Sequence, residues 1–154
     1  MNILATQYTL PYRSLEIYVA GCNGNPHCEQ CFNPESWNFE NGTKYTQNYF
    51  NEKIKQKVTT YSDLIKNIMI FGGEPLDQNH TDFMQMLKDL HNLNLPIWIF
   101  TRHDIKSVPN DVKKYCTYLK CGRYIPNLKT DSNVQYGIKL ATSNQKIYKK
   151  GIDF

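Results

Sequence analysis

Residues 67–76, Asn-Ile-Met-Ile-Phe-Gly-Gly-Glu-Pro-Leu, combine a short apolar run with a pair of glycines. The apolar run has the length of a strand and stops at Gly72-Gly73, which predicts a buried β-strand that ends there. Paired glycines let a ligand approach the backbone, and the Glu74 carboxylate is suited to accept from an ammonium group. Gly-Gly before proline is also a common turn, and the segment matches neither a phosphate loop nor a dinucleotide fingerprint. The segment therefore marks a candidate ligand site without supporting phosphate binding.

On either side of this strand, short apolar runs alternate with segments whose apolar residues recur at the spacing of a helix. Strands that alternate with helices are typical of βαβ units and a parallel sheet, whose working groups gather at the carboxyl ends of the strands. The cysteine loop from Cys22 to Pro34 and the Gly72-Gly73 turn both follow predicted strands, so we expect them on the same rim. The predicted elements are a strand over 15–20, a helix from Thr46 with Phe50, Ile54 and Val58 on one face, the strand over 67–71, a helix over 81–93, a strand over 96–100, a weaker helix over 110–115 and a strand over 116–120.

Composition narrows the class of protein. The 154 residues suffice for one domain, 40% of them are hydrophobic, and the net charge is +4. The lysines are spread along the chain, so nucleic-acid binding is not indicated. No apolar run is long enough to cross a bilayer and no secretory signal is visible, which predicts a cytoplasmic protein without a membrane partner. Five cysteines, an odd number in a chain without a signal, argue against a disulfide framework.

Three of the cysteines lie in one polar loop. Cys22, Cys28 and Cys31 are separated by five and by two residues, and thiolates two residues apart can converge on one metal centre. An iron–sulfur cluster held by three cysteines keeps one iron open to a small molecule. Zinc fits the spacing equally well, with His27 or a distant cysteine as the fourth ligand, although His27 is awkwardly placed beside Cys28. Inert buried thiols are the third interpretation, and the favoured one for the two remaining cysteines.

Together, the cysteine loop and the glycine turn resemble radical S-adenosyl-L-methionine (SAM) proteins, and more closely the anaerobic ribonucleotide reductase activating proteins. The resemblance rests on Gly21-Cys22, on residues 28–37 (Cys-Glu-Gln-Cys-Phe-Asn-Pro-Glu-Ser-Trp) and on residues 72–76 (Gly-Gly-Glu-Pro-Leu). Residues 121–124 and 143–146 are weaker similarities. The resemblance implies one α/β domain over residues 1–154, an incomplete barrel of mostly parallel strands with helices outside, and an oxidoreductase of anaerobic metabolism.

The same resemblance implies a [4Fe-4S] cluster on Cys22, Cys28 and Cys31, whose fourth iron binds the amino and carboxylate groups of SAM. One electron from a flavodoxin- or ferredoxin-type donor would cleave SAM to methionine and a 5′-deoxyadenosyl radical. That radical would install a glycyl radical on an anaerobic ribonucleotide reductase or a related enzyme. The cofactor carries the hard step, while the protein orients it and excludes water. The residues expected along SAM are Gln30, Phe32, Asn33, Gly72, Gly73, Glu74 and Thr101, with Phe32 either on the adenine or in the core.

The chain departs from this family's pattern at several positions. Five residues rather than three separate Cys22 from Cys28, and Gln30 and Cys121 stand where relatives have Gly and Asp. A Trp-Arg-Gly run near the C-terminus is missing, and residues 101–103 (Thr-Arg-His) replace Thr-Gly-Tyr. Arg102 and His103 follow a strand, so they are expected on the same rim, facing SAM, the partner or solvent. Two alternatives stay open: a small radical SAM enzyme acting on a metabolite or peptide, and a non-catalytic zinc-binding interaction module.

Overall fold

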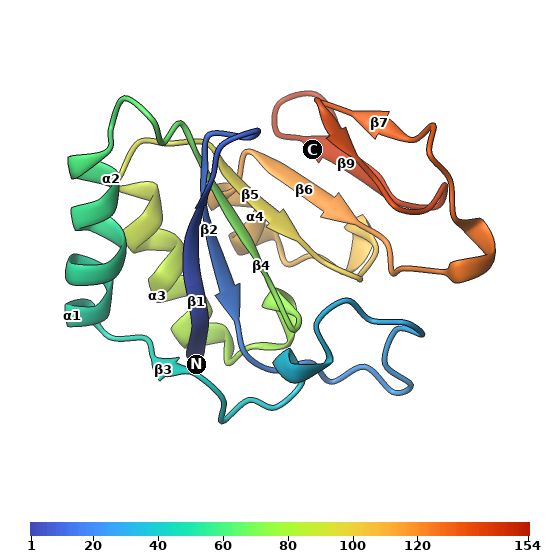
Figure 1. The fold of residues 1–154 in the computed structure, drawn as a ribbon, viewed down its shortest axis with the longest axis horizontal. Helices are drawn as coiled ribbons and strands as arrows, with labels where there is room; N and C mark the ends of the chain where they lie inside the picture. Colours follow the sequence, from blue (N-terminus) through green and yellow to red (C-terminus); the bar gives the residue numbers. More distant parts are fainter.

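A seven-stranded sheet forms the centre of the protein, in a computed structural model that describes all 154 residues (Figure 1). The strand order is β3-β1-β2-β4-β5-β6-β9. The four middle strands run parallel to one another, which confirms the predicted α/β fold with a mostly parallel sheet. These strands are β2 (Ser14–Val19), β4 (Asn67–Gly72), β5 (Ile97–Phe100) and β6 (Tyr118–Cys121), and the sequence predicted a strand at each of these places.

The edges of the sheet are antiparallel, and the sequence patterns did not predict them. β1 (Asn2–Thr9) pairs with β2 and carries β3 (Thr43–Lys44) on its outer side. β9 (Lys146–Lys149) pairs with β6 at the opposite edge. Ile3 is the one buried residue of β1, so no apolar alternation marks this segment as a strand.

Helices cover one face of the sheet, as Figure 1 shows for α1, α2 and α3. Thr46 caps the first of them as predicted, because its hydroxyl accepts from the backbone N–H of Tyr49. None of the helices has the length and apolar character needed to cross a membrane. The helical segments are η1 (Pro34–Ser36), α1 (Gln47–Tyr49), the π-helical η2 (Phe50–Lys55), α2 (Gln56–Thr60), η3 (Pro75–Asp77), α3 (His80–His91), η4 (Ile105–Ser107), α4 (Asn110–Tyr115) and η5 (Pro126–Leu128).

Successive residues of the parallel strands point to two different apolar clusters. Ile68 and Ile70 of β4 lie in the main core with the helices, whereas Met69 lies in a second cluster on the other face. The C-terminal segment covers that second face, because Ile138, Leu140 and Ile147 belong to the same cluster. A strand that is buried on both faces is a continuous apolar run, which is why the sequence revealed these strands. The short hairpin of this segment is formed by β7 (Val134–Gln135) and β8 (Ile138–Lys139).

The carboxyl ends of β2 and β4 meet at one rim through a close backbone contact. The backbone N–H of Glu74 donates to the carbonyl of Gly21 at 2.7 Å, and that of Gly73 donates to the carbonyl of Val19 at 2.9 Å. A Cβ on Gly73 would lie 2.1 Å from the Gly21 carbonyl oxygen, so only glycine allows this approach. The cysteine loop and the glycine turn are therefore side by side, on the same rim as expected for two segments that follow parallel strands.

Candidate functional site

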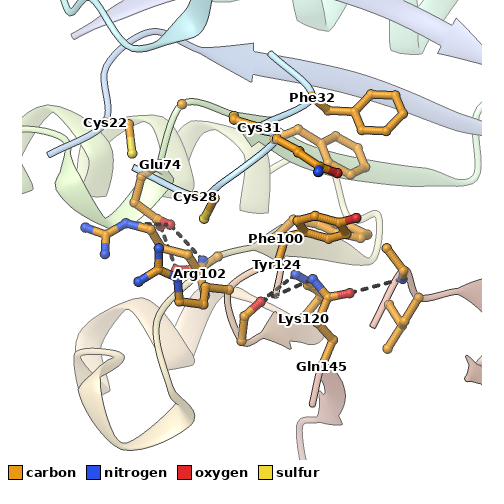
Figure 2. Close-up of a pocket in the computed structure, with 18 of the residues that line it drawn as sticks. Cys22, Cys28, Cys31, Phe32, Glu74, Phe100, Arg102, Lys120, Tyr124 and Gln145 are labelled. Atoms are coloured by element: carbon orange, nitrogen blue, oxygen red, sulfur yellow. Dashed lines mark hydrogen bonds and ion pairs between the residues drawn. The ribbon is translucent and has the colours of Figure 1, made fainter. Parts of the chain in front are cut away.

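A cavity of about 390 Å³ opens at this rim, within the size range of small-molecule sites (Figure 2). Its lining comes from the cysteine loop, the turn after β4, the ends of β5 and β6, and the C-terminal segment. Eight of the ten residues expected to hold the cluster or SAM line this one cavity: Cys22, Cys28, Gln30, Cys31, Phe32, Gly73, Glu74 and Thr101.

Asn33 and Gly72, the other two, do not line the cavity. Asn33 lines a separate hollow beside β1, and its carbonyl accepts from the backbone N–H and the hydroxyl of Ser36. Gly72 packs against β2, where a Cβ would lie 2.1 Å from the carbonyl oxygen of Val19. In the structure Asn33 accepts local hydrogen bonds and Gly72 packs closely on a neighbouring strand. Contact of either residue with a ligand stays a prediction.

The three cysteines of the loop are free thiols, each half-buried (Figure 2). Burial raises the pKa of the Cys22 thiol. No group of three or more His, Cys, Asp or Glu side chains is arranged so that it could hold a metal ion. In a [4Fe-4S] cluster each cysteine binds a different iron, so the ligands surround the cluster instead of converging on one ion. Three soft thiol donors around one cavity fit the chemistry of such a cluster.

The other two cysteines and His27 do not line the cavity. Cys116 is buried in the main core, as expected for an inert thiol, and burial raises its pKa to about 12. Cys121 is also buried there, with a pKa raised to about 12 by the same cause. His27, considered as a zinc ligand, instead places its Nε2 3.1 Å from the Cys22 carbonyl oxygen and stacks on Trp37.

Glu74 is the buried carboxylate of the cavity, with 1% of its surface exposed. One of its oxygens accepts from the Thr101 hydroxyl at 2.6 Å and from the backbone N–H of Leu76 at 3.0 Å. Its other oxygen accepts from the backbone N–H of Arg102 at 2.8 Å. Burial raises the pKa of Glu74, and these hydrogen bonds oppose the rise. Glu74 and Thr101 therefore join the loops after β4 and β5, and the carboxylate keeps limited capacity for a further donor.

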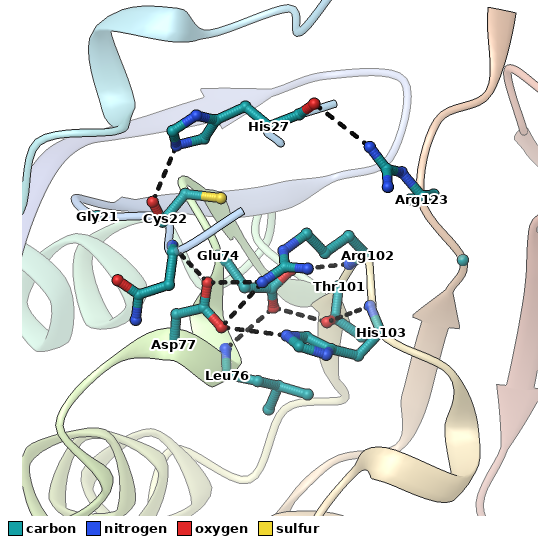
Figure 3. Close-up of polar contacts among 12 residues, drawn as sticks. Gly21, Cys22, His27, Glu74, Leu76, Asp77, Thr101, Arg102, His103 and Arg123 are labelled. Carbon is teal, nitrogen blue, oxygen red and sulfur yellow. Dashed lines mark hydrogen bonds and ion pairs between the residues drawn. The ribbon is translucent and has the colours of Figure 1, made fainter. Parts of the chain in front are cut away.

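Asp77 is a second carboxylate at this rim, which the sequence interpretation missed (Figure 3). The Arg102 guanidinium donates to both of its oxygens, at 3.1 and 3.3 Å, and His103 Nε2 lies 3.1 Å from one of them. Arg102 and His103 were expected on this rim, and the structure shows that Asp77 holds both. Asp77 ends the short turn after β4, so the rule that places working groups at strand ends would have identified it.

Positive charge predominates in the cavity lining. Four cationic side chains, Arg102, Lys120, Arg123 and Lys139, line the cavity, against the single carboxylate of Glu74. Arg102 is paired with Asp77 and Lys139 with Asp131, so the unpaired cations of the lining are Lys120 and Arg123. Burial lowers the pKa of Lys120 to about 8, and its amine donates to a backbone carbonyl two residues further on at 2.8 Å. This excess of positive charge suits a cluster bound by thiolates and a ligand that carries a carboxylate.

Gln145 ties the C-terminal segment to the end of β6 beside the cavity. Its side-chain oxygen accepts from the backbone N–H groups of Ala141 and Thr142, at 3.1 and 3.3 Å. Its amide donates to the carbonyl of Gly122 at 3.4 Å. The weak similarity of residues 143–146 to the activating proteins therefore falls on a segment that forms one wall of the cavity.

Aromatic and aliphatic side chains form the remaining wall. The rings of Phe71 and Phe100 pack with centroids 4.1 Å apart and line the cavity together with Ile138 and Leu140. Phe32 lies at the edge and is 99% exposed. The expectation that Phe32 is a core aromatic is wrong, because the cysteine loop carries this side chain out of the core, and its packing on an adenine stays a prediction.

Comparisons with known proteins agree with this geometry. Residues 12–148 match the protein family described as "4Fe-4S single cluster domain". The anaerobic ribonucleoside-triphosphate reductase-activating protein of Enterobacteria phage T4 is 27% identical over 118 residues, which cover 74% of this chain and 72% of the phage protein. No solved structure matches the chain significantly. The expected likeness to activating proteins is confirmed, and the chain belongs to the 4Fe-4S single cluster domain family.

Proposed function

We propose that this protein is an activase that cleaves SAM reductively and installs a glycyl radical on an anaerobic ribonucleotide reductase or a related enzyme. The observation that carries the proposal is the shared cavity, where three thiols after β2 and the Gly73-Glu74 turn after β4 face one small-molecule space. The phage relative, named for activating anaerobic ribonucleoside-triphosphate reductase, supports the choice of partner.

In this proposal Cys22, Cys28 and Cys31 hold a [4Fe-4S] cluster and leave one iron for SAM. When bound, the cluster supplies the electron that breaks the sulfonium bond of SAM, received from a flavodoxin- or ferredoxin-type donor. The cationic side chains of Arg102 and Lys120 offset the negative charge of the bound thiolates and of the SAM carboxylate.

The backbone of the loop and the turn binds and orients SAM in this proposal. Gln30 has a φ of +54°, a left-handed conformation that suits glycine, which agrees with the glycine expected here in relatives. Gly73 lines the cavity beside the SAM amino group, and the remaining lone pair of Glu74 accepts from that group. The Phe71 and Phe100 rings exclude water from the space where a reactive radical forms.

The test is anaerobic reconstitution with iron and sulfide, followed by SAM and dithionite. We expect about four irons per chain, a broad visible absorbance, and release of methionine and 5′-deoxyadenosine. Cys28→Ala should lose both the cluster and SAM cleavage, whereas Cys121→Ala, a matched control in the core, should keep both. A Cys28→Ala chain that still holds a full cluster and cleaves SAM would show that the ligand assignment is wrong.

Two further outcomes separate the alternatives. One zinc per chain without SAM cleavage would identify a zinc-binding interaction module. Electron paramagnetic resonance shows whether a glycyl radical forms in the reductase. SAM cleavage without that radical would indicate a metabolite or peptide substrate.

A further inference from the structure

The spacing of Cys22 and Cys28 is not set by secondary structure. Residues 20–33 form neither helix nor strand, and five residues separate these two thiols. A loop without regular structure loses conformational entropy when a ligand orders it, which weakens binding. Contacts that order the loop beforehand would remove that cost, and the structure shows such contacts at both ends of residues 23–27 (Figure 3).

At the start of this stretch, Asp77 accepts from the backbone N–H of Asn23 at 2.7 Å. The Asp77 side chain is 8% exposed and is itself fixed by Arg102 and His103. Asp77 lies after β4 and the other two side chains lie after β5, so one buried carboxylate joins three loops of the rim. A hydrogen bond from a backbone N–H to an ionised carboxylate is among the stronger ones in proteins.

At the end of the stretch, His27 folds back onto its beginning. Its Nε2 donates to the carbonyl of Cys22 at 3.1 Å, and its ring stacks on Trp37 with centroids 3.9 Å and planes 12° apart. The Arg123 guanidinium donates to the carbonyl of His27 at 3.3 Å. Gly24 permits this turn, because a Cβ there would lie 3.1 Å from the Cα of His27. His27, which precedes the second thiol, is thus hydrogen-bonded to the backbone of Cys22, which carries the first.

We infer that Asp77 and His27 are positioning residues that hold Cys22 and Cys28 at the same cavity before a cluster binds. Neither residue lines the cavity, so neither contacts a bound ligand directly. Asp77 also holds Arg102, which does line the cavity, whereas His27 makes no hydrogen bond or ion pair with Arg102. The inference rests on the ligand set of the proposed function. These contacts give a physical account of how a chain with two extra residues between its first thiols still brings both to one site.

The test compares Asp77→Asn and His27→Ala with the unchanged chain in two assays. The first is amide hydrogen exchange of Cys22 and Asn23, whose N–H groups donate to the Trp37 carbonyl and to Asp77, in the cluster-free protein. The second is the rate of iron incorporation during anaerobic reconstitution. Asp111→Asn is the matched control, because Asp111 lies 2.8 Å from His80 in an exposed carboxylate–histidine pair away from the cavity. Exchange in β4 and β5 reports whether each variant keeps its fold.

We expect exchange of the Cys22 and Asn23 amides to be about tenfold faster in both variants, the factor for a lost hydrogen bond of about 1.4 kcal/mol. Iron incorporation should slow severalfold in parallel, while Asp111→Asn behaves like the unchanged chain in both assays. His27→Gln keeps a donor near the position of Nε2 and should restore part of both rates, which loss of ring stacking alone would not allow.

The inference is overturned if the variants exchange faster but take up iron at the normal rate, if they take up iron more slowly without faster exchange, or if neither rate changes. If Asp77→Asn fails to fold, the two His27 variants decide, because they leave the contacts between β4 and β5 intact. Failure of the proposed ligand set is distinguishable, since Cys28→Ala would then still bind iron. Failure of SAM cleavage would leave both assays readable, because neither uses SAM.

Discussion

Gly73→Ala tests the close approach that places the cysteine loop against the turn after β4. A Cβ at position 73 would lie 2.1 Å from the carbonyl oxygen of Gly21 and 2.7 Å from that of Ser36. Ordinary contact begins at 3.4 Å, so the two loops must separate by about 1.3 Å. Both neighbouring atoms belong to the backbone, so rotation of a side chain does not relieve the clash.

The expected loss of stability follows from two terms. Separation of the loops breaks the 2.7 Å hydrogen bond from the Glu74 N–H to the Gly21 carbonyl, and an unsatisfied buried backbone group costs about 1–3 kcal/mol. Overpacking adds about 1–3 kcal/mol. We therefore expect Gly73→Ala to lower the free energy of unfolding by about 4 kcal/mol, which lowers the Tm of a chain of this size by about 10 °C.

The assay is unfolding of the cluster-free chain by urea and by heat, with circular dichroism as the probe of the transition. Gly151→Ala is the matched control, because Gly151 has a φ of +78° and nothing lies within 4 Å of its added Cβ. Backbone strain alone should cost that control about 1–2 kcal/mol. If Gly73→Ala destabilises the chain no more than Gly151→Ala, the close approach does not constrain position 73 and the reasoning is refuted.

Three further substitutions test the charges and hydrogen bonds of the rim. Burial lowers the pKa of Lys120 to about 8, so the unfolded chain keeps this proton to higher pH than the folded chain does. The stability of the unchanged chain should therefore rise relative to that of Lys120→Met between about pH 8 and 10.4. Urea titrations of both proteins across this pH range check the prediction, and equal pH profiles would contradict it. Burial alone would raise the pKa of Asp77, but its hydrogen bonds lower it overall, so its contribution is full at neutral pH and is lost as the pH falls below about 4. The stability difference between the unchanged chain and Asp77→Asn should therefore shrink in an acid titration, and a difference that stays constant to about pH 2 would argue against the ionised contact. Thr101→Val removes the hydroxyl that donates to the Glu74 carboxylate at 2.6 Å and should lower the free energy of unfolding in urea by about 1.5–3 kcal/mol. The control Thr59→Val, on an exposed helix face, should change this free energy little. Equal effects of the two substitutions would exclude the hydrogen bond as the cause.

Much of the fold could be predicted because its central strands are buried on both faces. Ile68 to Phe71 and Ile97 to Phe100 contribute side chains to both apolar clusters, so each strand is an uninterrupted apolar run between polar turns. The helix cap at Thr46 depends on residues three positions apart, which are also visible in the sequence. The outer strands β1, β3 and β9 were missed, because strands with few buried residues have no clear apolar pattern.

The sequence by itself determined the parallel centre and the rim, since the common direction of the strands follows from local apolar runs joined by helices. It therefore identified the thiols of the cysteine loop and the Gly73-Glu74 turn as neighbours. Only the tertiary structure decided which side chains hold that rim together, because Asp77 meets Asn23 across 54 positions of chain and Arg123 meets His27 across 96. Contacts of that kind depend on how separate loops approach one another in space, and no local pattern of residues encodes them.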